Sequence, residues 1–528
     1  MKKPPVIHPY LFALYPALAL LAHNITFVPV KDSLLPLLVV CSATALLFII
    51  IAAILRDRIK AGILTSFTVV MCFSYGHLYY LAGRYLFFFS SLAHKVVFLT
   101  CIVIFAIASY FCIRTGLSLL AFTRFLNRVA VILVMIPLIN IIFYTVETEI
   151  TLRKLRFVTK NKLSSGITTI ASPSIYYIIL DGYAREDVLR QLYHYENSGF
   201  IRFLREKGFY VADASKSNYC QTFLSLASSL NAEYLDSFVK SVGEDNSNHY
   251  LVRTLIQHNA VFDFVRKHGY KVYVFPSGYF GSEFSGQDIY YPKMRNVTLF
   301  HNELINLTPA PFLFSLLNPE NRINPYQRHR ERILGTLISI QALSKTQGHL
   351  FVFAHIMFAH PPFVFTKDGN AIDSQAPFSI ADGNKMEINI TPEEYRQQYV
   401  QQLMFLTKKL EQTIELILAF SFQPPVIILQ ADHGPGSMLH CEDAQATNIE
   451  ERFSILNAYY LPQGDDIGLY ATITPVNTFR VIFNHSFGAR YELLEDKSYF
   501  STWSKPYKLI PISSLNRKLF PEELKLKE

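Results

Sequence analysis

The sequence has few charged residues and no sign of thiolate or nucleic-acid chemistry. Only 17% of its 528 residues are charged, against 51% hydrophobic residues, and tryptophan occurs once. The six cysteines form no Cys-x-x-Cys pair, and zinc-finger spacings, basic helices and RNA-binding aromatic motifs are missing. These absences argue against a nucleic-acid-binding protein. Low charge combined with many apolar residues is instead typical of a chain that spends part of its length in lipid.

Long apolar runs occupy the first 150 residues. A helix that crosses a bilayer needs roughly 20 mostly apolar residues. No small-residue cleavage site follows the first run, which argues against a signal peptide. The sequence therefore predicts a transmembrane domain over residues 1–150 with about five helices. Their approximate ranges are Tyr10–Val28, Leu34–Leu55, Ala61–Leu81, Ala93–Ile113 and Val129–Val146.

Basic residues favour alternate ends of these helices. They gather at the N-terminus and in the loops around 56–60 and 114–128, and the net charge of +8 suits an anionic lipid surface. The positive-inside rule then places the N-terminus in the cytoplasm. Five crossings put everything after Val146 on the outer face, and one crossing more or fewer would reverse this. Residues 151–172 are predicted to be a juxtamembrane linker, either resting on headgroups or simply solvated.

From residue 173 to 528 the pattern changes to that of an α/β domain. Apolar stretches of strand length alternate with amphipathic helical stretches. Continuous apolar strands of this kind predict a mostly parallel sheet with helices on both faces. The expected strands are SIYYIILDG, YKVYVFPSG, HLFVFAH and PPVIILQADHG, and the clearest helices are SGFIRFLREKGF and the long EEYRQQYVQQLMFLTKKLEQTIELILAF. Residues 367–385 are interpreted as a surface loop.

Chemically useful side chains stand where three of these strands end. Asp181 ends the first, His355 ends another with His360 five residues later, and the adjacent Asp432 and His433 end the last. The carboxyl ends of parallel strands meet at one edge of a sheet, where ligands bind. Two carboxylates and an imidazole suit Zn²⁺ or Mn²⁺. The alternative for each residue is a helix cap, a turn or a packed core histidine.

A hydroxyl-rich stretch, SNYCQTFLSLASSLN, supplies a candidate nucleophile. Thr222 is predicted near a helix N-terminus, where backbone N–H groups and the helix dipole favour an anion. A hydroxyl bound to a metal ion loses its proton more readily and becomes nucleophilic. Ser217, Ser225 and a purely structural helix start remain alternatives. For Cys220 and Cys441, a disulfide and two buried free thiols both fit the sequence.

These short motifs resemble the alkaline phosphatase/sulfatase superfamily. With membrane helices in front, the chain is most similar to the branch that contains lipid A phosphoethanolamine transferases and lipoteichoic acid synthases. The matching motifs are LDG, TFLS, HIMFAHPP and DHG. The resemblance implies an α/β/α alkaline-phosphatase-like domain and a divalent metal, Zn or Mn. It also implies metal ligands Asp181, Thr222, Asp432 and His433, with Thr222 as nucleophile and His355, His360 and His440 as substrate-binding residues.

The chain departs from that family at several positions. Asp181 stands where the transferases usually have glutamate, Pro435 follows the DHG motif, and His440 comes sooner than the usual substrate-side histidine. The sulfatase motif Cys-x-Pro-Ser-Arg is missing, which argues against formylglycine chemistry.

The resulting hypothesis is an integral membrane phosphotransferase. It would move a phospholipid-derived phosphoryl headgroup to a lipid or glycan acceptor through a phosphothreonine, with membrane lipids as partners. A membrane-anchored phosphodiesterase, phosphatase or other ester hydrolase is the first alternative. A non-catalytic lipid sensor is the second.

Overall fold

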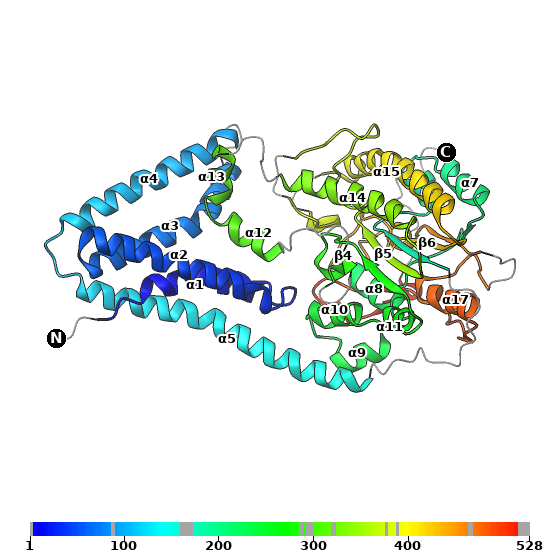
Figure 1. The fold of residues 1–528 in the computed structure, drawn as a ribbon, viewed down its shortest axis with the longest axis horizontal. Helices are drawn as coiled ribbons and strands as arrows, with labels where there is room; N and C mark the ends of the chain where they lie inside the picture. The colour runs from blue at the N-terminus through cyan, green and yellow to red at the C-terminus, as the bar shows by residue number, and fades with distance from the viewer. Residues whose placement is uncertain are drawn as a thin grey trace. The chain divides into compact units, whose positions relative to one another are not determined.

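The chain folds into two compact units. The computed structural model describes residues 4–85, 90–158, 173–284, 289–290, 299–317, 324–374, 378–386, 390–462 and 468–515. The membrane unit comprises Met1–Ile150 and Arg295–Ile323, and the α/β unit, which is called the catalytic unit below because it holds the candidate active site, comprises Thr151–Met294 and Asn324–Glu528 (Figure 1). A membrane part followed by an α/β part is as the sequence predicts. The segment Arg295–Ile323 is a difference, because the sequence assigned it to the α/β domain.

The membrane unit is entirely helical in the part that the structure describes. Four of its helices, α2 to α5, are long and apolar enough to cross a membrane. The predicted count of about five is one too high by this measure, because α1 has 16 residues and ends at His23, before the apolar run does. The helices are α1 (His8–His23), α2 (Lys31–Leu55), α3 (Arg58–Tyr85), α4 (Ser90–Arg114), α5 (Leu120–Val158), α12 (Leu299–Asn306) and α13 (Ala310–Leu317).

Helix α1 nevertheless runs alongside α3 and α5 in the same direction. At its start, the backbone N–H of His8 donates to Asn127 Oδ1 (3.0 Å), and His8 Nδ1 lies 2.5 Å from Ser66 Oγ. Near its end, Leu21 packs in one cluster with Ile141 of α5. Sixteen helical residues rise about 24 Å, somewhat less than the roughly 30 Å of a bilayer's hydrocarbon core. The two ends of α1 therefore lie at opposite ends of the helical bundle.

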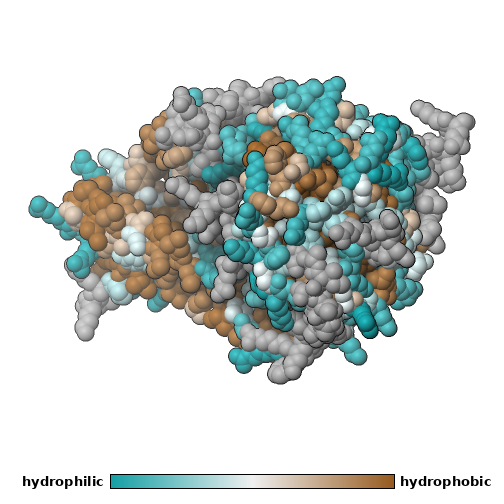
Figure 2. Space-filling view, turned by 45° about the vertical axis from the view of Figure 1, so that its right-hand side comes forward, coloured by the Kyte–Doolittle hydropathy of each residue, from teal (hydrophilic) through white to brown (hydrophobic). Residues whose placement is uncertain are grey.

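The outer surfaces of these helices are apolar. Figure 2 shows hydrophobic residues gathered over this part of the molecule. Such extended apolar exposure is unusual for a water-soluble surface and is what contact with lipid requires. More than half exposed are Leu34, Leu38, Ile54, Leu99, Phe111, Ile136 and Phe143.

The catalytic unit is built on a seven-stranded sheet in the order β2-β7-β6-β1-β5-β3-β4. All pairings are parallel except those of β7 with β6 and with β2. The central strands β1, β5 and β6 are buried at every position, which is why their sequences are continuously apolar. The strands are β1 (Ile175–Leu180), β2 (Tyr210–Val211), β3 (Lys271–Val274), β4 (Ile289–Tyr290), β5 (Leu350–Ile356), β6 (Val426–Gln430) and β7 (Asn457–Tyr460). A separate hairpin pairs β8 (Tyr499–Phe500) with β9 (Ile510–Pro511).

Helices cover both faces of this sheet. Helices α14 and α15 lie over one face, and α8, α10, α11 and α17 lie over the other (Figure 1). The predicted strands and helices are confirmed, and the mostly parallel sheet with them. The helices are α6 (Glu186–Leu192), α7 (Ser198–Glu206), α8 (Thr222–Ser229), α9 (Asp236–Val242), α10 (His249–Gln257), α11 (Ala260–Lys267), α14 (Pro325–Leu343), α15 (Pro392–Phe420), α16 (Ile449–Phe453) and α17 (Pro475–Phe487). Short 3-10 turns lie at Phe280–Ser282, Gly383–Lys385 and Ile512–Ser514.

The predicted linker over 151–172 is partly helical. Helix α5 continues through it as far as Val158. The rest of the predicted linker, residues 159–172, lies outside the described residues.

Candidate active site

Three acidic and imidazole side chains meet where β1 and β6 end. These strands pair in register, so Asp181, just after β1, comes beside Asp432 and His433, just after β6. His433 Nε2 lies 3.3 Å from Asp432 Oδ2 and 3.8 Å from Asp181 Oδ1, and all three residues are buried. One ligand atom from each lies within 4.8 Å of the others, which is the spacing of a metal site.

Thr222 brings a hydroxyl to the same place. It is the first residue of α8, and its Oγ1 lies 3.0 Å from His433 Nε2. Ser225, one turn later, donates instead to the backbone carbonyl of Asp432 (2.6 Å), so its role is structural. Ser217 does not line the pocket that Thr222 lines. Of these three hydroxyls, that of Thr222 is the one that lies beside a candidate ligand atom, the Nε2 of His433.

The donor set fits a divalent metal ion. Asp181 Oδ1 and both carboxylate oxygens of Asp432 are buried without any hydrogen-bond partner. An unpaired buried carboxylate is costly, and a cation between the two would compensate both. Tetrahedral zinc, with bonds of about 2.0–2.1 Å to nitrogen and oxygen, holds its donors roughly 3.3 Å apart. The separations from His433 Nε2 to Thr222, Asp432 and Asp181 are 3.0, 3.3 and 3.8 Å.

The protonation of His433 suits a ligand. Its Nδ1 donates to the carbonyl oxygen of Gly434 (2.9 Å), which leaves a lone pair on Nε2. Burial, followed by the positive charge of Arg452, lowers the pKa of His433. The imidazole is therefore neutral near pH 7, the form that binds a metal ion.

His355 contacts the second carboxylate oxygen of Asp181, Oδ2. It lies within β5, its Nε2 is 3.1 Å from Asp181 Oδ2, and its Nδ1 is 2.5 Å from Ser282 Oγ. Burial lowers the pKa of His355, but the hydrogen bond and charge of Asp181 outweigh it, and the net shift is upward. Burial likewise raises the pKa of Asp181, but His360 and His355 outweigh it, and that pKa falls well below its usual range. His355 does not line the pocket.

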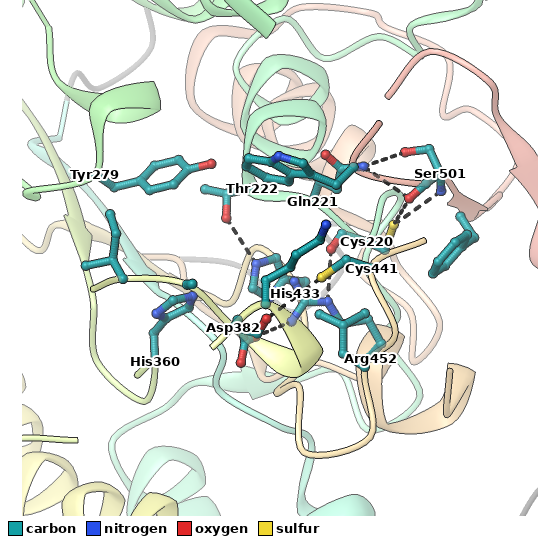
Figure 3. Close-up of a pocket in the computed structure, with 16 residues that line it drawn as sticks. Cys220, Gln221, Thr222, Tyr279, His360, Asp382, His433, Cys441, Arg452 and Ser501 are labelled. Carbon is teal, nitrogen blue, oxygen red and sulfur yellow. Dashed lines mark hydrogen bonds and ion pairs between the residues drawn. The ribbon is translucent and has the colours of Figure 1, made fainter. Parts of the chain in front are cut away.

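A cavity of about 260 Å³ opens beside Thr222 and His433. His360 lines it, and its Nδ1 donates to the Pro361 carbonyl (2.6 Å). His440 is exposed and takes no part in the wall, so the structure does not bring that predicted residue to the site. The wall, drawn in Figure 3, consists of Cys220, Gln221, Thr222, Tyr279, His360, Ile380, Ala381, Asp382, Lys385, His433, Leu439, Cys441, Arg452, Phe500, Ser501 and Trp503.

Two wall residues form a buried ion pair that the sequence did not indicate. Arg452 Nη1 lies 2.8 Å from Asp382 Oδ2. Arg452 also donates from Nε to the carbonyl of Cys220 (2.9 Å) and from Nη1 to that of Gly434 (3.0 Å). Cys220 lies two residues before Thr222, and Gly434 directly follows His433. One guanidinium thus ties the segment before Thr222 to the turn after His433.

Asp382 corrects the interpretation of residues 367–385 as a surface loop. The end of that segment enters the pocket wall, and Asp382 is almost fully buried. Burial raises the pKa of Asp382, but the charge of Arg452 outweighs it and keeps the carboxylate ionised. Neither residue belongs to a sequence motif. The two pair across 70 positions of the chain, and nothing in the sequence indicates that pairing.

The two glycines after His433 allow other atoms of the protein to approach the backbone closely, and neither adopts a left-handed conformation. Neither Gly434 nor Gly436 has a positive φ. A Cβ at 434 would overlap the carbonyl oxygen of Glu451, and one at 436 would overlap the carboxylate of Asp382. The turn therefore requires glycine because other backbone and side-chain atoms press against it.

Cys220 and Cys441 are both free thiols in the pocket wall. Cys220 Sγ donates to the carbonyl of Ser501 (3.4 Å), and burial raises the pKa of Cys441 to about 11. Neither is a thiolate near pH 7, so neither is in the nucleophilic form at that pH.

The catalytic unit is a mostly parallel sheet between two layers of helices, with the candidate site where β1 and β6 end. No model of a known protein family matches the sequence, and a search of curated proteins finds no match. Solved structures with a similar fold include the C-terminal periplasmic domain of EcEptC from Escherichia coli in complex with zinc. That comparison has 12% identity, covers 66% of this chain and 95% of that one, and gives a TM-score of 0.43.

Two further solved structures are similar to the chain at a comparably low level of identity. The integral membrane lipooligosaccharide phosphoethanolamine transferase EptA from Neisseria meningitidis shares 14% identity over 74% of this chain and 70% of its own, with a TM-score of 0.38. A sulfatase-class structure from Bacteroides thetaiotaomicron shares 12% identity over 66% and 76%, also at 0.38.

Proposed function

We propose that the protein is a membrane-embedded, metal-dependent phosphotransferase that uses a phospholipid as donor. The observation that supports it most is Thr222 Oγ1 at the start of α8, 3.0 Å from His433 and beside carboxylates that lack partners. Asp181, Thr222, Asp432 and His433 would hold the ion, with zinc or manganese the best match to mixed oxygen and nitrogen donors. Such an ion lowers the pKa of a hydroxyl and offsets negative charge on a phosphoryl group.

In the proposed reaction, different residues of the site bond to phosphorus, stabilise its oxygens and surround the headgroup. Thr222 Oγ bonds to phosphorus, the bond from phosphorus to the diacylglycerol oxygen breaks, and that oxygen takes up the threonine proton. An acceptor hydroxyl on a lipid or glycan next attacks phosphorus, the bond to Thr222 breaks, and Thr222 Oγ takes up the proton of the acceptor hydroxyl. Backbone N–H groups at the start of α8 and the His360 imidazole stabilise the charged phosphoryl oxygens. Tyr279 and Trp503 close the pocket around the headgroup.

The proposed location of the catalytic unit is the outer face of the membrane. Helix α1 starts beside the basic end of the bundle and finishes at the opposite end, as α3 and α5 do. The N-terminus and the end of α5 then face opposite sides of the membrane. Protease added to right-side-out vesicles should digest the catalytic unit and spare an N-terminal tag. Digestion of the tag alone would place the catalytic unit inside.

Mass spectrometry after incubation with phospholipids tests the nucleophile. We expect a phosphoryl-headgroup adduct on Thr222 in the wild type, none in Thr222→Ala, and wild-type labelling in Ser229→Ala, a change on the same helix away from the pocket. An adduct of unchanged yield in Thr222→Ala would refute the assignment. Headgroup that appears only as free water-soluble phosphoester would identify the protein as a hydrolase, because water would then be the acceptor.

A further inference from the structure

The segment between β4 and α14 leaves the catalytic unit and joins the membrane unit. Helices α12 and α13 lie within Arg295–Ile323, which packs with the membrane helices. The polypeptide consequently passes between the two units three times: after Ile150, after Met294 and after Ile323. A domain carried by a single linker would need only the first of these passages, so the other two call for an explanation.

Helices α12 and α13 pack against α1, α3 and α4 through specific contacts, which together are called the seat below. The backbone N–H of Gly76 in α3 donates to the carbonyl of Leu307 (2.9 Å), and a Cβ at position 76 would overlap the carbonyl of Asn306. The ring of Phe312 stacks on that of His94 in α4, with centroids 5.1 Å apart. Phe300 is buried in a cluster with Leu21 of α1. Contact through glycine backbone and stacked rings indicates a specific association.

The seat lies toward one end of the helical bundle. Gly76 precedes the end of α3 at Tyr85, and His94 follows the start of α4 at Ser90. Tyr79 stacks on His94 there, with ring centroids 3.5 Å apart. Tyrosine and histidine near helix ends are typical of the boundary between lipid and water. This end is opposite to the one where His8 begins α1.

The outward side of α13 is apolar. The helix APFLFSLL contains no charged residue, and none of its residues is buried. Its exposed apolar residues are Leu313, Phe314, Leu316 and Leu317, the last 80% exposed, and Ile305 of α12 joins them. This surface belongs to the same unit as the lipid-facing sides of α2 to α5. Eight helical residues rise only about 12 Å, so α13 is too short to cross a bilayer.

We propose that α12 and α13 form a hairpin seated in the membrane, whose apolar side contacts the acyl chains of one leaflet. The occupant of this surface is lipid, because the surface continues that of helices already in lipid and carries no charge to pair with a protein partner. The catalytic unit thereby gains a second attachment to the bilayer, besides α5. This inference does not depend on the reaction that the site performs.

The single tryptophan of the chain makes the test direct. In a Trp503→Phe background of the full-length protein, Leu317→Trp is reconstituted in vesicles of phosphatidylcholine brominated on its acyl chains. The positive control is Ile107→Trp, because Ile107 is 53% exposed on the lipid-facing side of α4. The negative control is Ile338→Trp, because Ile338 is 63% exposed on α14 of the catalytic unit. We expect Leu317→Trp to lose at least half of its fluorescence, as Ile107→Trp does, while Ile338→Trp loses little.

Two outcomes would overturn the proposal. Quenching of Leu317→Trp no greater than that of Ile338→Trp would show that the hairpin lies in water. Protection from brominated lipid and from aqueous acrylamide together would show that a protein, such as a second copy of this chain, covers the surface. Phe314→Trp, 44% exposed on the same helix, repeats the measurement at a second position.

Discussion

Replacing Asp432 by asparagine should abolish metal binding and transfer, yet leave the metal-free protein at least as stable as the wild type. Both oxygens of Asp432 are buried without a partner, beside the equally unpaired Oδ1 of Asp181. In the metal-free protein these like charges repel each other in a buried site, so neutralising one should remove an unfavourable interaction. We expect a loss of activity of about 10³-fold or more, because electrostatic stabilisation is the main contribution of such a site.

Thermal unfolding with and without a chelator separates the two effects. At an ion concentration 100 times the dissociation constant, the wild type should gain about 2.7 kcal/mol of unfolding free energy, and Asp432→Asn should gain none. Asp443→Asn, in an exposed loop nearby, should behave as the wild type. If Asp432→Asn unfolds far more easily than the wild type in chelator, the carboxylate has a structural role and the ligand assignment is wrong.

The sequence was informative where one local pattern determines one local structure. The aliphatic runs before Asp432 and Asp181 each predicted a buried strand, because only strands covered on both faces are apolar at every position. The carboxyl ends of such strands share an edge, so the meeting of Asp181 with His433 followed from topology. The helix start at Thr222 was equally local.

Features that depend on distant packing were not predictable in this way. The place of His440 depended on the path of a loop, and that loop leaves it exposed. The close backbone approach at Gly434 was not predictable, because the carbonyl that presses on it comes from Glu451, in another element. Apolar composition alone could not show that Leu299–Leu317 packs with the membrane helices, because a soluble helix pair can have the same short apolar pattern.

The Arg452–Asp382 ion pair is the clearest example of such distant packing, because its two residues lie 70 positions apart. Arg452→Met should destabilise the protein by about 3–5 kcal/mol, because it leaves the buried carboxylate of Asp382 without its partner. It should also lower kcat/KM by about 10²-fold or more, because the carbonyls of Cys220 and Gly434 lose their shared donor. The single variant alone cannot separate these two causes.

The double variant Arg452→Met with Asp382→Asn does separate them. The asparagine removes the unpaired charge and still offers Oδ1 to Tyr395 and Gly383, so the unfolding free energy should return most of the way to the wild-type value. Activity should stay low, because the carbonyls of Cys220 and Gly434 still lack the donor that they share in the wild type. Arg330→Met, which breaks the more exposed pair with Asp373, should cost less than about 1 kcal/mol and leave kcat/KM unchanged. Recovery of both stability and activity in the double variant would mean that Arg452 only neutralises Asp382. Recovery of stability alone would establish the guanidinium as the residue that positions the nucleophile against the metal ligands.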